Sequence, residues 1–191
     1  MSELLQRGNH KLPRSTGIFN LPRAITCPGR TAYCQKVCYA GKAERMYKAV
    51  LPYRTRMLTL TKDPSFVGLM TAEILRSKRS VIRIHESGDF YDQAYLDKWI
   101  GIAAALPKVT FYAYTKSHML DFSRRPANLI VRLSTDPTSG TEAIAALPGF
   151  DGEAWTVAKK SIEKSNIFVC PGSCKTCDYC LKPGHVQFHE H

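Results

Sequence analysis

Four cysteines lie within eleven residues near the end of the sequence, and their spacing is typical of metal ligands. The intervals of three, two and two residues are short enough for all four sulfur atoms to reach one centre. Such consecutive short intervals favour ferredoxin-type iron–sulfur ligation, because a zinc site usually has two ligand pairs separated by a longer loop. We expect a 4Fe-4S cluster, with zinc as the alternative, and the four ligands are Cys170, Cys174, Cys177 and Cys180.

The other three cysteines, Cys27, Cys34 and Cys38, form a second group near the N-terminus. Cys34 and Cys38 are four positions apart, so they share one face of the helix that we expect over residues 31–50. Cys27 precedes this helix in a loop. Three thiolates can hold a cluster with one iron left open, or a cysteine of the tail can complete the set and join the two ends of the chain. The sequence therefore allows one cluster or two.

Disulfide bonds are the alternative use of these cysteines. Their number is odd, and the first seven residues contain no apolar segment of a secretory signal. A chain of this length also buries roughly 70% of its unfolded surface without cross-links. We therefore expect reduced thiols and a cytoplasmic protein. No membrane partner is expected, because the longest uncharged apolar stretch, 99–107, is far shorter than the ~20 residues of a membrane span.

The net charge of +11 comes entirely from the N-terminal part of the chain. Residues 1–80 contain 15 Lys and Arg against 4 Asp and Glu, whereas residues 81–191 contain 12 of each kind. A basic surface can bind the phosphates of nucleic acid, stabilise an anionic cluster or simply be solvated. For the binding of an anionic substrate or the tuning of a cluster, the candidate residues are Arg30, Arg45, Arg54 and Arg56.

Short strands alternate with helical segments after residue 80, and this pattern favours parallel pairing with right-handed crossovers. The predicted fold class is α/β, either a partial barrel or an open, mostly parallel sheet. Periodicity and turn residues place strands at 80–85, 108–114, 128–134, 154–158 and 166–169, and helices at 91–106 and, more weakly, 141–147.

We expect one domain over residues 1–191. Its basic, mostly helical part, 1–80, contains the first cysteine group; the strand-and-helix body is 81–169, and the cysteine-rich, metal-binding tail is 170–182. Within the first part, residues 1–26 resemble a loop, and helices are expected at 31–50, 52–60 and 65–79. The final histidines, His185, His189 and His191, are expected at an exposed, frayed terminus.

Polar residues follow three of the expected strands, where the chemistry of parallel α/β folds is concentrated. His85, Glu86, Asp89 and Lys116 are the candidate catalytic residues, which would contact substrate or transfer protons. Structural roles are the alternatives: Asp89 can cap the helix that follows, and Glu86 can pair with an arginine. For substrate or anion binding, the candidates are Ser87, Gly88, Arg132 and Ser134, with Gly88 allowing close approach of a ligand to the backbone.

Several motifs resemble the phage gene product 88 family. The resemblance covers about residues 17–182, and it implies a phage or prophage origin, hence the host cytoplasm, and an iron–sulfur protein without specifying a reaction. The motifs that carry it are Phe19-Asn20-Leu21-Pro22, Thr26-Cys27-Pro28-Gly29, Cys34, Cys38-Tyr39-Ala40, Glu86-Ser87-Gly88-Asp89-Phe90, Phe111-Tyr112-Ala113-Tyr114-Thr115-Lys116-Ser117 and the terminal cysteines.

The spacing of Cys170, Cys174 and Cys177 is also similar to the three-cysteine motif of radical S-adenosylmethionine enzymes, which combine it with a partial α/β barrel. This more distant resemblance implies S-adenosylmethionine as a second cofactor, bound at an open iron. Here the motif follows the strands instead of preceding them, and Thr176 stands where an aromatic residue is typical.

Two classes of function follow from these observations. The first is an iron–sulfur oxidoreductase or radical-S-adenosylmethionine-like enzyme, with an unidentified small-molecule substrate or electron-transfer partner. The second is a non-catalytic module that binds DNA or RNA through residues 1–80 and is stapled by zinc or by an iron–sulfur cluster.

Overall fold

The computed structural model describes residues 3–157 and 167–190, and within them one eight-stranded sheet contains segments from both ends of the chain. The strand order is β1-β2-β3-β4-β5-β6-β8-β7, and every neighbouring pair is parallel except β1 with β2. The predicted α/β class with an open, mostly parallel sheet is confirmed. The strands are β1 Gln6–Arg7, β2 Thr16–Phe19, β3 Val81–Ile84, β4 Thr110–Thr115, β5 Leu129–Thr135, β6 Glu153–Val157, β7 Phe168–Val169 and β8 Val186–His189.

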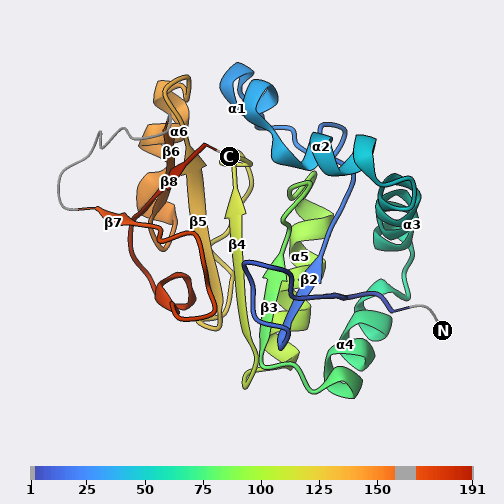
Figure 1. The fold of residues 1–191 in the computed structure, drawn as a ribbon. Helices are drawn as coiled ribbons and strands as arrows, with labels where there is room; N and C mark the ends of the chain where they lie inside the picture. Colours follow the sequence, from blue (N-terminus) through green and yellow to red (C-terminus); the bar gives the residue numbers. More distant parts are fainter. Residues whose placement is uncertain (1–2, 158–166, 191) are drawn as a thin grey trace.

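The helices are distributed unevenly around this sheet. Figure 1 shows α1 and α2 beyond the carboxyl ends of the strands, while α3 and α4 lie to one side. Among the described residues, no helix is both long enough and apolar enough to cross a bilayer. The helices are α1 Ala32–Val37, α2 Tyr39–Met46, α3 Val50–Lys62, α4 Phe66–Ser77, α5 Gln93–Ala105 and α6 Thr141–Ala145, with single 3-10 turns η1 Leu147–Gly149 and η2 Tyr179–Leu181.

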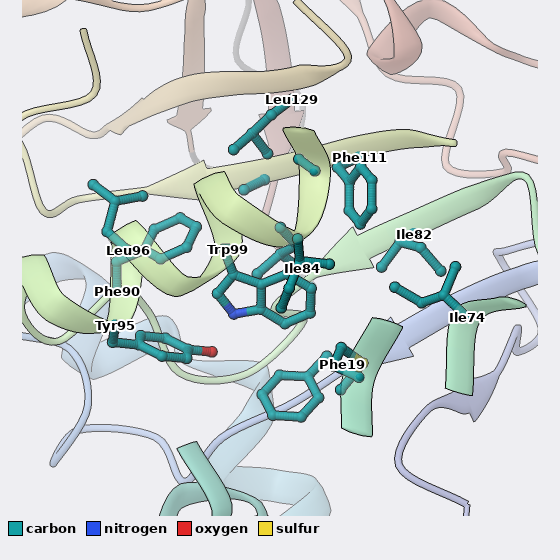
Figure 2. Close-up of a cluster of buried hydrophobic side chains, with 14 of the residues drawn as sticks. Phe19, Ile74, Ile82, Ile84, Phe90, Tyr95, Leu96, Trp99, Phe111 and Leu129 are labelled. Atoms are coloured by element: carbon teal, nitrogen blue, oxygen red, sulfur yellow. The ribbon is translucent and has the colours of Figure 1, made fainter. Parts of the chain in front are cut away.

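The main hydrophobic core lies between the central strands and helices α4 and α5. Alternate residues of each strand point towards the helices, as the two-residue period of a strand requires. Figure 2 shows the Trp99 ring of α5 at the centre of this cluster. Its ring centroid is 5.3 Å from that of Phe19 and 5.7 Å from that of Phe66, both in edge-on arrangements. This packing fixes the strands, and therefore the edge at which their carboxyl ends meet.

The strands and helices predicted after residue 80 are present with small differences at their ends. Of the predicted strands at 154–158 and 166–169, residues 158 and 166 lie outside the described residues. Among the described residues, three strands were not predicted, namely β1, β2 and β8. Residues 1–26 are not a simple loop, because they contain β1 and β2, and β2 pairs with β3 inside the sheet.

The prediction of a frayed C-terminus was also wrong for the described residues. Strand β8 lies between β6 and β7, and its Gln187 is fully buried. His189 is paired with Val157 in this ladder, whereas His185, which directly precedes the strand, is exposed as predicted. His191 lies outside the described residues.

The helix predicted over residues 31–50 is divided into α1 and α2 at Cys38. The Cys38 backbone is extended, with φ −63° and ψ 102°, so it ends one helix and begins the next. Cys34 and Cys38 therefore do not share the face of a single helix. No glycine or proline lies at this break, so the local pattern of residues could not predict it.

Candidate metal centre

The loop that carries Cys27 packs directly against the end of β4. A Cβ atom on Gly29 would lie 1.9 Å from the carbonyl oxygen of Lys116, so only glycine permits this approach. Within the same loop, the Thr26 hydroxyl donates to the Pro22 carbonyl at 2.6 Å, and the Cys27 amide donates to the Ala24 carbonyl at 3.1 Å. These contacts fix Cys27 at the carboxyl edge of the sheet.

Thr31 holds the second cysteine of this group over the end of β5. It is the N-cap of α1: its Oγ1 accepts a hydrogen bond from the Cys34 amide at 3.0 Å. The same hydroxyl donates to Asp136 Oδ2 at 2.6 Å. Cys38 follows one helix later, at the junction of α1 and α2.

Lys116 and Asp136 form a nearly buried ion pair beside this helix. The Lys116 ammonium lies 2.6 Å from Asp136 Oδ2 and donates to the Ser134 carbonyl at 3.1 Å. Burial alone would raise the pKa of Asp136, but the hydrogen bonds from Lys116 and Thr31 outweigh it, and the pKa is lowered. Asp136 therefore remains ionised and keeps Lys116 in place.

Asp89 is the second buried carboxylate at this edge. It accepts hydrogen bonds from the Thr115 hydroxyl at 2.6 Å, the Phe90 amide at 2.7 Å and the Lys116 amide at 2.8 Å. Burial nevertheless raises its pKa to about 6, because these donors only partly compensate for lost hydration. Asp89 is thus positioned to exchange a proton near neutral pH.

All seven cysteines are free thiols of intermediate exposure. Burial raises the pKa of Cys27 to about 12, and the Asp89 carboxylate adds to this effect. Burial also raises the pKa of Cys34, where the Lys116 ammonium acts in the opposite direction. Within residues 3–157 and 167–190, no three or more His, Cys, Asp or Glu side chains are grouped so that they could hold a metal ion.

The second cysteine group is held against the sheet by Arg132, whose side chain is completely buried. Its Nε donates to the Gly184 carbonyl at 2.6 Å and its Nη1 to the Cys180 carbonyl at 2.9 Å. Its Nη2 donates to the carbonyls of Tyr179, at 3.2 Å, and Lys182. These donors, proposed from the sequence for an anion, are directed at the backbone of the tail.

The tail covers the face of β4 opposite the main core. The Arg83 guanidinium lies over the Tyr114 ring, 5.0 Å from its centroid. Burial raises the pKa of Cys174, and the Arg83 charge opposes that shift. The Gly172 amide donates to Cys170 Sγ at 3.4 Å, a contact of the kind that tunes sulfur ligands. The Cys174 amide donates to the Lys11 carbonyl at 2.9 Å, which joins the tail to the N-terminal segment.

The two cysteine groups therefore occupy different positions on the sheet. Cys27, Cys34 and Cys38 lie at the carboxyl ends of the strands, whereas the tail lies over the side chains of β4 and β5. Thiol–thiol interactions within each group contribute to the raised pKa values: Cys38 acts on Cys34, and Cys180 acts on Cys174.

Of the candidate catalytic residues, Asp89 and Lys116 lie with the first cysteine group, whereas His85 points into the hydrophobic core. Its backbone has a positive φ of 67°, and its Nε2 lies 2.8 Å from the Tyr95 hydroxyl. The ring packs edge-on against Phe90 at 5.0 Å. Burial lowers the pKa of His85 to about 3, so the ring is neutral at physiological pH.

The remaining residues of the segment 86–88 have structural contacts. Glu86 Oε1 accepts a hydrogen bond from Asn9 Nδ2 at 2.9 Å, and the Ser87 hydroxyl donates to the Leu21 carbonyl at 2.9 Å. Gly88 has φ 84°, and a Cβ there would lie 2.6 Å from Leu21 Cβ. The absence of a side chain at Gly88 therefore allows close packing against the loop that contains Leu21, and not the approach of a ligand that the sequence suggested.

The four candidate basic residues contact different groups. Arg30 Nη1 donates to the Ala24 carbonyl at 2.7 Å, within the Cys27 loop. Arg54 is buried and pairs with Glu44 at 2.9 Å. Arg45 is exposed at the end of α2, and Arg56 is exposed on α3 with its guanidinium 5.6 Å from the Tyr53 ring centroid.

Two residues at this site were not among the sequence candidates, Thr31 and Asp136. A threonine three positions before Cys34 is a recognisable N-cap signal. Asp136 follows the third expected strand, so the rule that singled out Asp89 and Lys116 applies to it equally.

Together, the fold and the site define a cysteine-rich α/β protein with free thiols at the carboxyl ends of a parallel sheet and in a separate tail. Residues 3–166 match the family model described as "Gene product 88", and the chain belongs to this family. The match includes Cys27, Cys34 and Cys38, whereas the four tail cysteines follow it. The resemblance to this family is thus confirmed.

Two curated relatives are similar to the chain, both described as "Gene 88 protein". The protein of Mycobacterium phage L5 is 35% identical and that of Mycobacterium phage D29 is 30% identical, each over 129 residues. The aligned region is 60% of this chain and 54% of each relative, so the chain spans about half the length of the curated relatives it matches. No solved structure matches the chain. Neither relative's description names an iron–sulfur cluster or S-adenosylmethionine.

Proposed function

We propose that this phage-family protein binds iron–sulfur clusters through its two cysteine groups. In this proposal, Cys27, Cys34 and Cys38 bind a 4Fe-4S cluster with one open iron, and the four tail cysteines bind a second centre. The observation that carries the proposal is the position of the first group at the carboxyl edge of the sheet, beside Asp89 and the Lys116–Asp136 pair. This is the edge at which parallel α/β folds place their ligands.

The donor set fits a polynuclear cluster better than a single zinc ion. In a cluster each thiolate binds a different iron, so the sulfur atoms need not converge on one point. The thiols are unpaired and half-buried. Metal binding replaces their protons, because thiolates are the ligands. The Lys116 ammonium would partly balance the negative charge of such a centre.

When bound, a cluster of this kind supplies one-electron transfer and, at an open iron, a position for a ligand. The residues of the chain contribute the surroundings. Asp89, with a pKa of about 6, can accept or donate a proton next to Cys27. Asp136 fixes the Lys116 ammonium, which can orient an anionic ligand at the same edge.

Anaerobic purification followed by iron, sulfide and zinc analysis tests the proposal. We expect a coloured protein that contains iron and sulfide. Cys34→Ala and Cys174→Ala should each remove part of the iron and leave the rest, because the two groups are separate. Gln35→Ala and Thr176→Ala change exposed neighbours of the ligands and are the matched controls.

Three results would count against parts of this proposal. A folded protein without iron would exclude the cluster. Zinc in place of iron would favour the alternative of a non-catalytic module stapled by zinc. If Cys34→Ala or Cys174→Ala alone removed all the iron, one shared centre would replace two. The radical-enzyme form predicts that the reduced, fully loaded protein cleaves S-adenosylmethionine to methionine and 5′-deoxyadenosine; no cleavage would remove that form and leave electron transfer.

A further inference from the structure

A basic cavity lies beside the amino-terminal ends of strands β2 and β3. The first cysteine group lies at the opposite, carboxyl ends of the strands. Its volume is about 480 Å³, and it lies between the N-terminal segment, the end of α4 and the residues that lead into β3. Five cationic side chains line it: Arg7, Arg14, Arg76, Lys78 and Arg79. None of them was a candidate for anion binding in the sequence, because Arg7 and Arg14 lie more than sixty positions before Arg76, Lys78 and Arg79.

The cavity has an excess of positive charge. Among the described residues only two carboxylates line it, and each already has an arginine partner: Glu3 accepts from Arg7 at 3.4 Å, and Glu73 pairs with Arg76. Three cations remain, Arg14, Lys78 and Arg79, and within the described part of the chain none of them forms an ion pair with a carboxylate. An anion in the cavity would therefore meet three uncompensated positive charges.

Arg79 is held in one geometry by the protein itself. Its Nη1 donates to the carbonyls of Arg14 at 3.0 Å and Thr16 at 3.2 Å. Its stem packs over Gly17, where a Cβ would lie 2.8 Å from Arg79 Cδ. A guanidinium that is held in this way is suited to an oxyanion, because little side-chain entropy is lost on binding.

Lys78 occupies a backbone conformation that usually requires glycine. It is the C-cap of α4, with φ 51° and ψ 35° in the left-handed region. Glycine would adopt this conformation at lower cost, and asparagine is the usual second choice. A lysine at this position gives up backbone stability and adds a cation to the cavity.

We propose that this cavity binds the phosphate groups of a ligand. The proposal is independent of the proposed metal centre, which lies at the carboxyl ends of the strands. No aromatic side chain of the described residues lines the cavity, so recognition would rest on phosphate and not on base stacking. The phosphates of a nucleic-acid strand and free phosphate share this chemistry.

The proposal can be tested by titrating the 191-residue chain with pyrophosphate and, separately, with a labelled single-stranded oligonucleotide at low salt. The informative variant is Arg14→Ser combined with Lys78→Gly. Glycine relieves the left-handed strain at position 78, and Arg14 is exposed, so this variant should fold at least as well as the parent. Lys62→Gln removes an exposed positive charge at the end of α3, away from the cavity, and is the control.

We expect the double variant to weaken binding by about tenfold or more for each cation removed, whereas Lys62→Gln leaves the affinity unchanged. If an oligonucleotide is the ligand, the dependence of log K on log salt should become shallower by about 1 per charge removed. Binding of pyrophosphate without the oligonucleotide would identify a small phosphate ligand. The proposal is overturned if neither probe binds more tightly than about 1 mM, or if the double variant binds as the parent does.

Discussion

The Thr31 hydroxyl donates a hydrogen bond to Asp136 Oδ2 at 2.6 Å, although the two residues are 105 positions apart. The same hydroxyl caps α1 by accepting from the Cys34 amide. Lys116 binds the same carboxylate oxygen from the end of β4. Three segments of the chain therefore meet at one carboxylate, and the position of Cys34 relative to the sheet depends on it.

Thr31→Val should lower the free energy of unfolding by about 1–2 kcal/mol, because it removes the N-cap of α1 and one hydrogen bond to a buried carboxylate. Urea denaturation measures this change. Thr59→Val is the matched control, since within residues 3–157 and 167–190 the exposed Thr59 hydroxyl donates only to the Thr55 carbonyl of its own helix. We also expect less iron per chain in Thr31→Val. Equal losses of stability in both variants would show that Thr31 does not link the cysteine helix to the sheet.

Arg132→Leu should destabilise the protein by at least about 3 kcal/mol, because four carbonyl groups within residues 179–184 lose a buried charged donor. Besides the lower free energy of unfolding, we expect the tail itself to become more mobile than the rest of the protein. We expect the tail cysteines to react faster with an alkylating reagent, while Cys27, Cys34 and Cys38 keep their rates, as measured by mass spectrometry of digested protein.

Arg124→Leu is the control for this prediction, because Arg124 is exposed and pairs with Asp97 at 2.7 Å on the surface. It should change the free energy of unfolding by less than about 1 kcal/mol. Uniform acceleration of all seven cysteines in Arg132→Leu would mean that Arg132 supports the whole fold and does not hold the tail in particular.

The central strands were predictable because their signal is local. Strands β3, β4 and β5 are runs of β-branched, aromatic and aliphatic residues between turn signals. By contrast, β2 contains Gly17, and it is stabilised by pairing with β3 more than sixty positions later. Strand β8 similarly depends on β6 and β7. Pairing of this kind leaves no periodic pattern in a short segment.

The same distinction applies to the site. The rule that strand ends meet in a parallel sheet correctly suggested that Asp89 and Lys116 lie together. It could not indicate the direction of His85, because the positive φ of that residue turns its side chain towards Tyr95 and the core. It could not identify Arg132 as the residue that holds the tail either, since the carbonyls it binds lie about fifty positions away.

His85 should make the protein less stable in acid. Its pKa is about 3 in the folded protein against an ordinary value of 6.5, so between these values the unfolded chain binds a proton that the folded protein does not. Stability that is fully present above pH 6.5 is therefore lost as the pH falls, by up to about 1.4 kcal/mol per pH unit. His85→Phe keeps an aromatic ring against Phe90 and removes this titration.

We expect the unfolding free energy of His85→Phe to fall less steeply than that of the parent between pH 6.5 and 3, as measured by denaturation at a series of pH values. A parallel pair of curves for parent and His85→Phe would show that His85 is accessible to protons in the folded state.

Asp89 should have the opposite effect on the pH dependence. Its pKa is raised from 3.8 to about 6, so between these values the folded protein holds a proton that the unfolded chain has released. Stability contributed by the protonated form is therefore lost as the pH rises through this window, again by up to about 1.4 kcal/mol per pH unit.

In the parent protein, Asp89 and His85 have opposite effects on the pH dependence of the unfolding free energy between about pH 4 and 6. Asp89→Asn should therefore reveal the His85 slope: its unfolding free energy should rise more steeply with pH than that of the parent. An unchanged slope in Asp89→Asn would place the Asp89 pKa at its ordinary value and would exclude Asp89 as a proton carrier beside Cys27.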